Sequence, residues 1–215
     1  LNDSHVSENT ARAPNGQNIS DNLRHAVTYL LGLKRQPAAV LINGDLAHNQ
    51  GLRGDYQQFT ALIQPLVAAG IEVHMTLGNH DDREMFLEVL VEHTAIASPV
   101  TSKHVAIVAG QRANFFLLDS LKTVNQAAGE LGEEQLAWLT KALDQRADRP
   151  AIIVVHHDPQ FTPNGPDAKF TWSGLTDAKS LFEQVLPRRQ VKAYFHGHIH
   201  RWGLQKKGDL HLVNT

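Results

Sequence analysis

The sequence predicts an α/β fold organised as one layered domain, and three observations lead to that prediction. Short runs of β-branched and apolar residues alternate along the chain with longer segments that have helical periodicity. Several of these runs are almost continuously apolar, as is typical of strands that are covered on both faces. The length of 215 residues suits one sizeable core, and the chain contains neither an internal repeat nor a low-complexity tract.

Each predicted strand is a short apolar run that ends at polar or turn-forming residues. In chain order the predicted strands are Ala38–Asn43, Ile71–Leu77, Val105–Ala109, Asn114–Asp119, Ala151–Val155, Lys192–His196 and Leu210–Asn214. The predicted helices between them are Ser20–Leu33, Asp55–Ala68, Asp82–His93, Glu133–Leu143 and Thr176–Leu186. Leu136, Leu139 and Leu143 form the apolar stripe of the fourth helix. Ser20 or Asp21 is the expected cap of the first helix.

The composition is that of an ordinary globular protein, with 42% hydrophobic residues and a net charge of −2. This balance provides no global basic field that would attract nucleic acid or anionic lipid. The absence of cysteine excludes disulfides, thiolate zinc sites and cysteine nucleophiles. No apolar run approaches the ~20 residues of a membrane span, so we expect no membrane segment. The compartment stays open: a cytoplasmic location is the expectation, but a targeting signal could precede Leu1.

Side chains that can bind metal follow five of the strand-like segments, if the start of the chain is counted as the end of a clipped strand. They are Asp3 and His5; Asp45; Asn79, His80 and Asp81; His156 and His157; and His198 and His200. A single histidine after a strand is more often an ordinary loop residue, and "GD" is commonly a turn. Five such segments at one sheet edge favour a ligand site, because α/β sheets bind ligands there.

The chemistry and number of these side chains indicate a pair of metal ions. Carboxylates, an amide oxygen and imidazoles without a thiolate suit Mn²⁺, Fe or Zn²⁺. The candidate ligands Asp3, His5, Asp45, Asn79, His156, His198 and His200 exceed what one ion of four to six ligands needs. A shared carboxylate could hold two ions about 3.5–4 Å apart, as in phosphatase and nuclease centres. Gly44, Gly78 and Gly197 each precede a candidate ligand and allow a sharp backbone turn there.

These residues also carry a family resemblance. The blocks "DSH", "GD", "GNHD", "HH" and "GHIH", in that order, closely resemble the signature of calcineurin-like metallophosphoesterases. The stretch "GELGEEQLAWLTKAL" is similar to the class III cyclic-nucleotide phosphodiesterase branch, which includes glycerophosphodiesterases. The resemblance covers nearly the whole chain. It implies a four-layer α/β/β/α sandwich of two mixed β-sheets flanked by helices.

The resemblance implies a role for each matching residue. Asp3, His5 and His200 would bind a first ion, Asp45 would bridge, and Asn79, His156 and His198 would bind a second. His80 would contact the phosphate and protonate the leaving oxygen, while Asp81 would orient His80. The cofactors implied are two divalent or mixed-valence ions, Mn²⁺, Fe²⁺/Fe³⁺ or Zn²⁺.

The chain departs from the family pattern at two places. It has "HHDP" where the family often has "HHPP", so Asp158 adds a carboxylate near the second ion. Within the histidine pair, His156 is the expected ligand and His157 the alternative. Leu1 stands just before a motif that should end a strand, so residues 1–215 are expected to be a single metallophosphoesterase domain truncated at one or both ends.

The expected reaction is hydrolysis of a phosphoester bond by metal-bound hydroxide, because two cations neutralise the phosphoryl oxygens and acidify a shared water. The expected partner is a small-molecule substrate of the cyclic-nucleotide or glycerophosphodiester type. The alternatives are a phosphomonoesterase using the same site and a non-catalytic protein-binding scaffold. Nucleic acid is not expected, because the basic clusters Pro187–Lys192 and Gln205–Lys207 are short. A homo-oligomer remains open.

Overall fold

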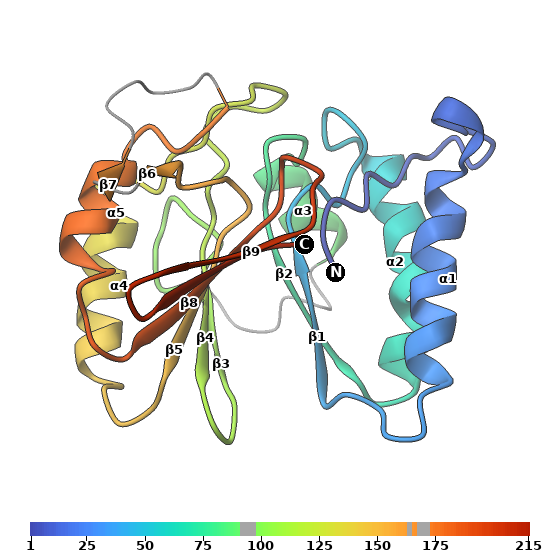
Figure 1. Ribbon diagram of the computed structural model, residues 1–215. Helices are drawn as coiled ribbons and strands as arrows, with labels where there is room; N and C mark the ends of the chain where they lie inside the picture. Colours follow the sequence, from blue (N-terminus) through green and yellow to red (C-terminus); the bar gives the residue numbers. More distant parts are fainter. Residues whose placement is uncertain (91–97, 163–164, 167–172) are drawn as a thin grey trace.

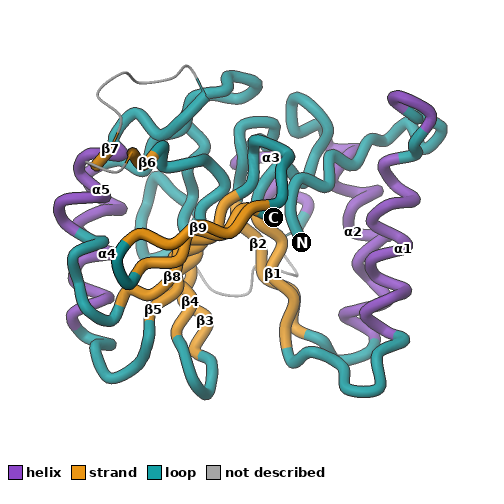
Figure 2. Tube along the Cα trace, viewed as in Figure 1, coloured by secondary structure: helices purple, strands orange, loops and turns teal. Residues whose placement is uncertain are grey.

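The computed structural model describes residues 1–90, 98–162, 165–166 and 173–215. Two β-sheets face each other, and helices cover the outer face of each, so that the layers follow the order helix, sheet, sheet, helix (Figures 1 and 2). This arrangement confirms the predicted four-layer α/β class. None of the helices in the described residues is both long and apolar enough to cross a membrane.

The smaller sheet pairs β1 (Ala39–Asn43) with β2 (Glu72–Thr76) in parallel. Three helices accompany this sheet: α1 (Ile19–Leu31), α2 (Arg53–Ala68) and α3 (Arg83–Val89). Buried apolar residues of the two long helices, including Val27 and Phe59, pack with those of the strands in one continuous core. The start of the chain runs beside the end of β1 and forms single parallel bridges with it and with the loop that follows.

The larger sheet contains six strands in the order β3-β4-β5-β8-β10-β9. Their bounds are β3 Ala106–Ala109, β4 Asn114–Leu117, β5 Ala151–Val154, β8 Val191–His196, β9 Gly203–Lys207 and β10 Leu210–Asn214. The four central strands are parallel, and β3 and β9 pair antiparallel at the two edges. Helices α4 (Glu133–Asp144) and α5 (Ala178–Gln184) cover the outer face and contribute to a second core.

All seven predicted strands are present within two residues at each end, and each predicted helix matches one of the structure. The cap of α1 differs from the expectation, because the Asn18 side chain accepts the hydrogen bond from the Asp21 amide. Helix α3 ends at Val89, and the last part of the prediction, up to His93, lies outside the described residues. The expectation of two mixed sheets holds for the large sheet only, since both strands of the small one are parallel.

The sequence pattern missed four short elements. Strand β9 has the sequence "GLQKK", whose side chains are mostly exposed, and an edge strand of this kind lacks the apolar signal of a buried one. The two-residue strands β6 (Phe161–Thr162) and β7 (Gly165–Pro166) and the 3-10 helix η1 (Pro14–Gly16) lie outside every predicted strand and helix. These elements are too short for periodicity to reveal.

One edge of the molecule collects the loops that follow β1, β2, β5 and β8 (Figure 1). Asn43, the last residue of β1, joins the two sheets there, because its side-chain amide donates to the Val155 carbonyl oxygen at 3.0 Å. The side-chain oxygen of Asn43, Oδ1, accepts a 2.7 Å hydrogen bond from the Thr76 hydroxyl at the end of β2. The strand ends of both sheets are thereby held at one place.

Candidate metal centre

Metal-capable side chains from both sheets converge at this edge in three overlapping groups. Within each group the donor atoms lie no more than 4.8 Å from one another. The first group is Asp3, His5 and His200, and the second is Asp45, His156 and His198. A third group, His5, Asp45 and His80, links the other two. Residues separated by almost the entire chain therefore meet at one site.

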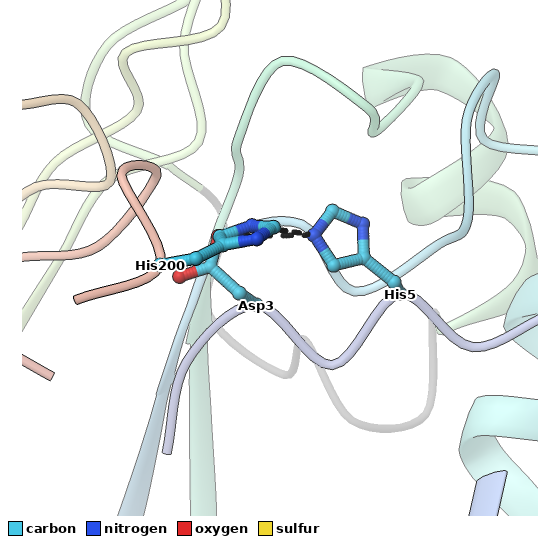
Figure 3. Close-up of side chains that lie close together, drawn as sticks. All are labelled: Asp3, His5 and His200. Carbon is cyan, nitrogen blue, oxygen red and sulfur yellow. Dashed lines mark hydrogen bonds and ion pairs between the residues drawn. The ribbon is translucent and has the colours of Figure 1, made fainter. Parts of the chain in front are cut away.

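The first group joins the start of the chain to the loop after β8. The His5 Nε2 atom lies 3.1 Å from His200 Nε2, and the Asp3 carboxylate lies 3.5 Å from the same His200 nitrogen. Figure 3 shows the two rings and the carboxylate directed toward one another. On its other side, the His5 ring contacts the His48 carbonyl oxygen through Nδ1 at 3.3 Å. A carbonyl oxygen accepts only, so Nδ1 carries the proton and Nε2 offers its lone pair to the group.

In the second group Asp45 and His156 are buried, and His198 is half-buried. His156 Nδ1 lies 3.1 Å from the Asn43 carbonyl oxygen and donates to it, so Nε2 is the nitrogen that faces the site. That Nε2 lies 3.2 Å from the Asp45 carboxylate, which is also 3.7 Å from His5 Nε2 of the first group. Asp45 therefore stands between the two groups. His198 supplies the third donor of the second group.

The Asp45 carboxylate is ionised, and the histidines around it differ in charge. Burial by itself would raise the pKa of Asp45, but the combined attraction of the surrounding histidines, with His156 the strongest, holds that pKa well below its usual range. At His156 the attraction of Asp45 likewise outweighs burial and raises the pKa to about 9, so a cation bound at this ring would take the place of a proton. Burial, together with the neighbouring His156, lowers the pKa of His198 to about 4, and burial also lowers the pKa of His5. The His5 and His198 rings are therefore mainly neutral near pH 7.

The backbone is strained at the residues that supply these donors. Positive φ angles, which are uncommon outside glycine, occur at Asp3 (49°), His5 (42°), Asp45 (49°), His198 (68°) and His200 (48°). Each such residue costs of order 1–3 kcal/mol and persists only where the surrounding structure imposes it. Five of the seven predicted ligands share this geometry, which concentrates strain at the proposed site.

Two glycines make the close packing of this site feasible. Gly44 has a φ of 73°, and a Cβ atom there would lie 2.5 Å from His156 Nδ1. A Cβ atom on Gly78 would overlap the Asp45 carboxylate. Any larger residue at either position would displace a donor, which explains why glycine precedes a candidate ligand in both blocks.

A buried polar atom with no hydrogen-bond partner in the described residues supports a metal site here. Asn79 Oδ1, an atom of a predicted ligand, is in this state. A buried polar atom without a partner is costly, and this oxygen is a lone-pair donor that a cation would satisfy. Together with the converging groups around Asp45, the residues present fit a pair of metal ions.

The structure distinguishes the two neighbouring histidines. His156 belongs to a converging donor group with Asp45, as expected for the first histidine of the pair. His157 instead uses its Nδ1 atom in a 2.7 Å hydrogen bond with the Ser120 hydroxyl. Burial keeps the pKa of His157 well below the ordinary histidine value, so the ring is neutral. The extra carboxylate, Asp158, accepts a hydrogen bond from the Gln160 amide and is in none of the donor groups found among the described residues.

His80 belongs to the donor group that links the other two, and hydrogen bonds to its neighbours hold it in place. Its amide donates to the Asp45 carboxylate at 2.9 Å, and its Nδ1 lies 3.0 Å from the Asn49 carbonyl oxygen. With Asp45, Asn79 and His198, the residue lines a hollow of about 540 Å³. The ring is therefore oriented by the Asn49 carbonyl group, with Nδ1 protonated.

Asp81 differs from the expectation that it orients His80. Its carboxylate is fully buried and accepts hydrogen bonds from the Tyr56 hydroxyl and from the amides of Leu46, Ala47 and Gly78, at 2.9–3.2 Å. Burial and the charge of Asp45 raise the pKa of Asp81 to about 7. Asp81 ties the loop after β1 to the loop after β2, so its effect on the site is to hold the backbone around Asp45 and Asn79.

Four residues at the site were not predicted from the sequence. Asn43, Asn49 and Tyr56 act through contacts described above, and Asn125 donates its amide to the Asn79 carbonyl oxygen at 2.6 Å. Asn43, a polar residue that ends an apolar strand, could have been noticed. Asn49 and Asn125 gave no signal, because they act through main-chain atoms, which do not depend on residue type. Tyr56 gave none, because its hydroxyl reaches Asp81 only in the folded chain.

Comparison with known proteins finds relatives that are named as phosphodiesterases. The chain is 28% identical, over 93% of its length, to a cAMP/cGMP dual specificity phosphodiesterase of Mycobacterium tuberculosis, and it spans 60% of that protein. It is 26% identical, over 99% of its length and 72% of the relative's, to a 3',5'-cyclic adenosine monophosphate phosphodiesterase of Pseudomonas aeruginosa. It is 29% identical, over 72% of its length, to a glycerophosphodiester phosphodiesterase of Enterobacter lignolyticus, of which it spans 56%.

A crystal structure of a dimetal phosphatase from Danio rerio shares the fold, with a TM-score of 0.76 at 16% identity. The match covers the whole of this chain and 85% of that one. The family profile described as calcineurin-like phosphoesterase matches residues 1–202. The ordered motifs, the two-sheet sandwich and this match agree, and the chain belongs to the calcineurin-like phosphoesterase family.

Proposed function

We propose that this chain hydrolyses small-molecule phosphodiesters at a centre of two metal ions. Asp3, His5 and His200 would hold one ion, Asn79, His156 and His198 the other, and Asp45 would bridge them. The observation that carries the proposal is the position of the ionised Asp45 carboxylate between two groups of lone-pair donors. Mn²⁺, Fe²⁺/Fe³⁺ and Zn²⁺ suit this set of carboxylate, amide and imidazole ligands.

Two bound cations would supply charge neutralisation for the phosphoryl oxygens and would lower the pKa of a bound water. The chain's own residues do the rest. His80 donates a proton to the leaving oxygen through Nε2, because the Asn49 carbonyl group keeps the proton of Nδ1 in place. The same nitrogen can therefore lose and regain its proton without a change in ring orientation. The tie between Asp81 and the two loops keeps the donors in position during this exchange.

The shape of the site favours diesters. His200 borders two hollows, one of about 540 Å³ that contains His80 and one of about 520 Å³ that contains Asp3 and His5. A phosphodiester carries two organic arms, and the hollows offer a space for each. The relatives in the comparison are phosphodiesterases by name, which supports the same choice.

The proposal is tested with bis-p-nitrophenyl phosphate as a chromogenic diester. His80→Ala and Asn79→Ala should each lower turnover by about 100-fold or more while the fold, measured by circular dichroism, is retained. His25→Ala is the matched control, because this histidine is exposed on α1 and belongs to no donor group found among the described residues. If both site variants hydrolyse the diester at the wild-type rate, the proposed site is wrong. A higher rate on p-nitrophenyl phosphate than on the diester would identify a monoesterase instead.

A further inference from the structure

The hollow next to the first donor group is lined by residues from several parts of the chain. Asp3, His5 and His200 are among them. Others come from the segment that leads into α1 and the start of that helix, and from the loop between β8 and β9, here called the β8–β9 wall. Both segments lie at the upper end of the molecule in Figure 1. Its volume of about 520 Å³ is in the range of small-molecule sites.

The β8–β9 wall presents an indole to solvent. Trp202 is 80% exposed, more than any other large hydrophobic side chain in the described residues. Tryptophan is costly to leave in water, and an indole beside a hollow offers a flat apolar face for a ligand. Trp202 follows His200 by two residues, so this face lies close to the first donor group.

The lining from the segment before α1 and the start of α1 combines apolar and amide groups. Pro14 and Ile19 supply apolar surface, and Gln17 and Asn22 supply side chains that can both donate and accept hydrogen bonds. A flat apolar face and amide groups around one hollow are the combination that binds a planar heterocycle, with stacking on the ring and hydrogen bonds to its edge. A hydrated polar arm such as glycerol has no flat ring that could stack on the indole.

We propose that Trp202 is a specificity-determining residue, whose indole stacks on a planar aromatic group, such as a nucleobase, carried by one arm of the substrate. The inference rests on the proposed diesterase function and deepens it. Because His80 lines the other hollow, the leaving arm lies there, and the arm bound by Trp202 is the one that stays on the phosphate. Asn22 and Gln17 then contact the edge of the ring.

The experiment compares two substrates that share the p-nitrophenolate leaving group but differ in the retained arm. They are the p-nitrophenyl ester of thymidine 5'-phosphate and methyl p-nitrophenyl phosphate. Trp202→Ala should lower kcat/KM for the thymidine ester about tenfold, mainly through KM, and leave the methyl ester within about twofold. Trp202→Phe should restore most of the loss, because a phenyl ring also stacks.

Tyr29→Ala is the matched control, since Tyr29 is an exposed aromatic residue of α1 that does not line this hollow. It should leave both rates unchanged. An equal loss on both esters in Trp202→Ala, or no loss on either, would overturn the assignment. If wild-type protein hydrolyses neither ester, the diesterase proposal fails, but the stacking role of Trp202 can still be tested. Calorimetry then compares the binding of thymidine 5'-phosphate to the wild type and to Trp202→Ala. Equal affinities in that titration would reject the stacking role.

Discussion

Replacement of Arg83 by alanine tests whether a buried ion pair joins the two halves of the sandwich. Arg83 opens α3, beside the small sheet, and Asp119 follows β4 of the large one. The Arg83 Nε atom lies 2.6 Å from one Asp119 oxygen, and Nη2 lies 3.1 Å from the other. A second bond from Nη2 reaches the Leu121 carbonyl oxygen at 2.8 Å. The pair therefore anchors the start of the loop that later brings Asn125 to Asn79.

The expected loss follows from the burial of the acid. Asp119 is 0% exposed, so Arg83→Ala would leave a carboxylate in the interior, and the hydrogen bonds left to it among the described residues come from the amides of His104 and Leu121. Removal of one partner from a buried pair costs roughly 3–5 kcal/mol. Since 1 kcal/mol shifts the Tm of a chain of this size by about 2–4 °C, we expect a fall of roughly 6–20 °C. Arg83→Lys should lie in between, because an ammonium group lacks the two-pronged geometry.

The assay is urea and thermal denaturation of each variant, with Arg53→Ala as the matched control. Arg53 pairs with Glu88 at the surface, where both side chains are about half exposed, and such pairs are worth only about 0–1 kcal/mol. Equal shifts of the unfolding midpoint in Arg83→Ala and Arg53→Ala would show that the Arg83–Asp119 pair stabilises the fold no more than a surface pair. Unfolding of Arg83→Ala at the wild-type temperature would show that the pair does not stabilise the fold.

Two further substitutions test the site itself. Asp45→Asn should lower the content of both metal ions, whereas Asp3→Asn should lower that of one, because Asp45 belongs to two of the three donor groups and Asp3 to one. Elemental analysis of dialysed protein measures this, and two retained ions in Asp45→Asn would contradict a bridging role. Asp81→Ala should destabilise the fold by about 3 kcal/mol or more, since it removes the shared acceptor of three amides and the Tyr56 hydroxyl. Urea denaturation measures the free energy of unfolding. A loss under about 0.5 kcal/mol, the size of an ordinary surface change, would contradict this prediction.

The strands and long helices could be predicted because each carries its own local pattern. The run "AAVLIN" is apolar enough to indicate β1, and the spacing of Leu136, Leu139 and Leu143 indicates α4. The edge strand β9 could not be predicted, because its polar residues gain their place only by pairing with β10. The same limit applies to the Asn18 cap, which competes with Ser20 and Asp21 in sequence.

The sequence alone determined which side chains could meet at the site, because the carboxyl ends of parallel strands share one edge, and polar residues at those ends stand out against apolar runs. Tertiary structure decided how the donors are grouped, with Asp45 between the two groups and His156 rather than His157 in the second. It also decided that Asn49 orients His80 while Asp81 braces the loops. These contacts use main-chain atoms or join residues far apart in the chain. No residue type encodes either kind of contact, and only the packing of the two sheets brings the partners within reach.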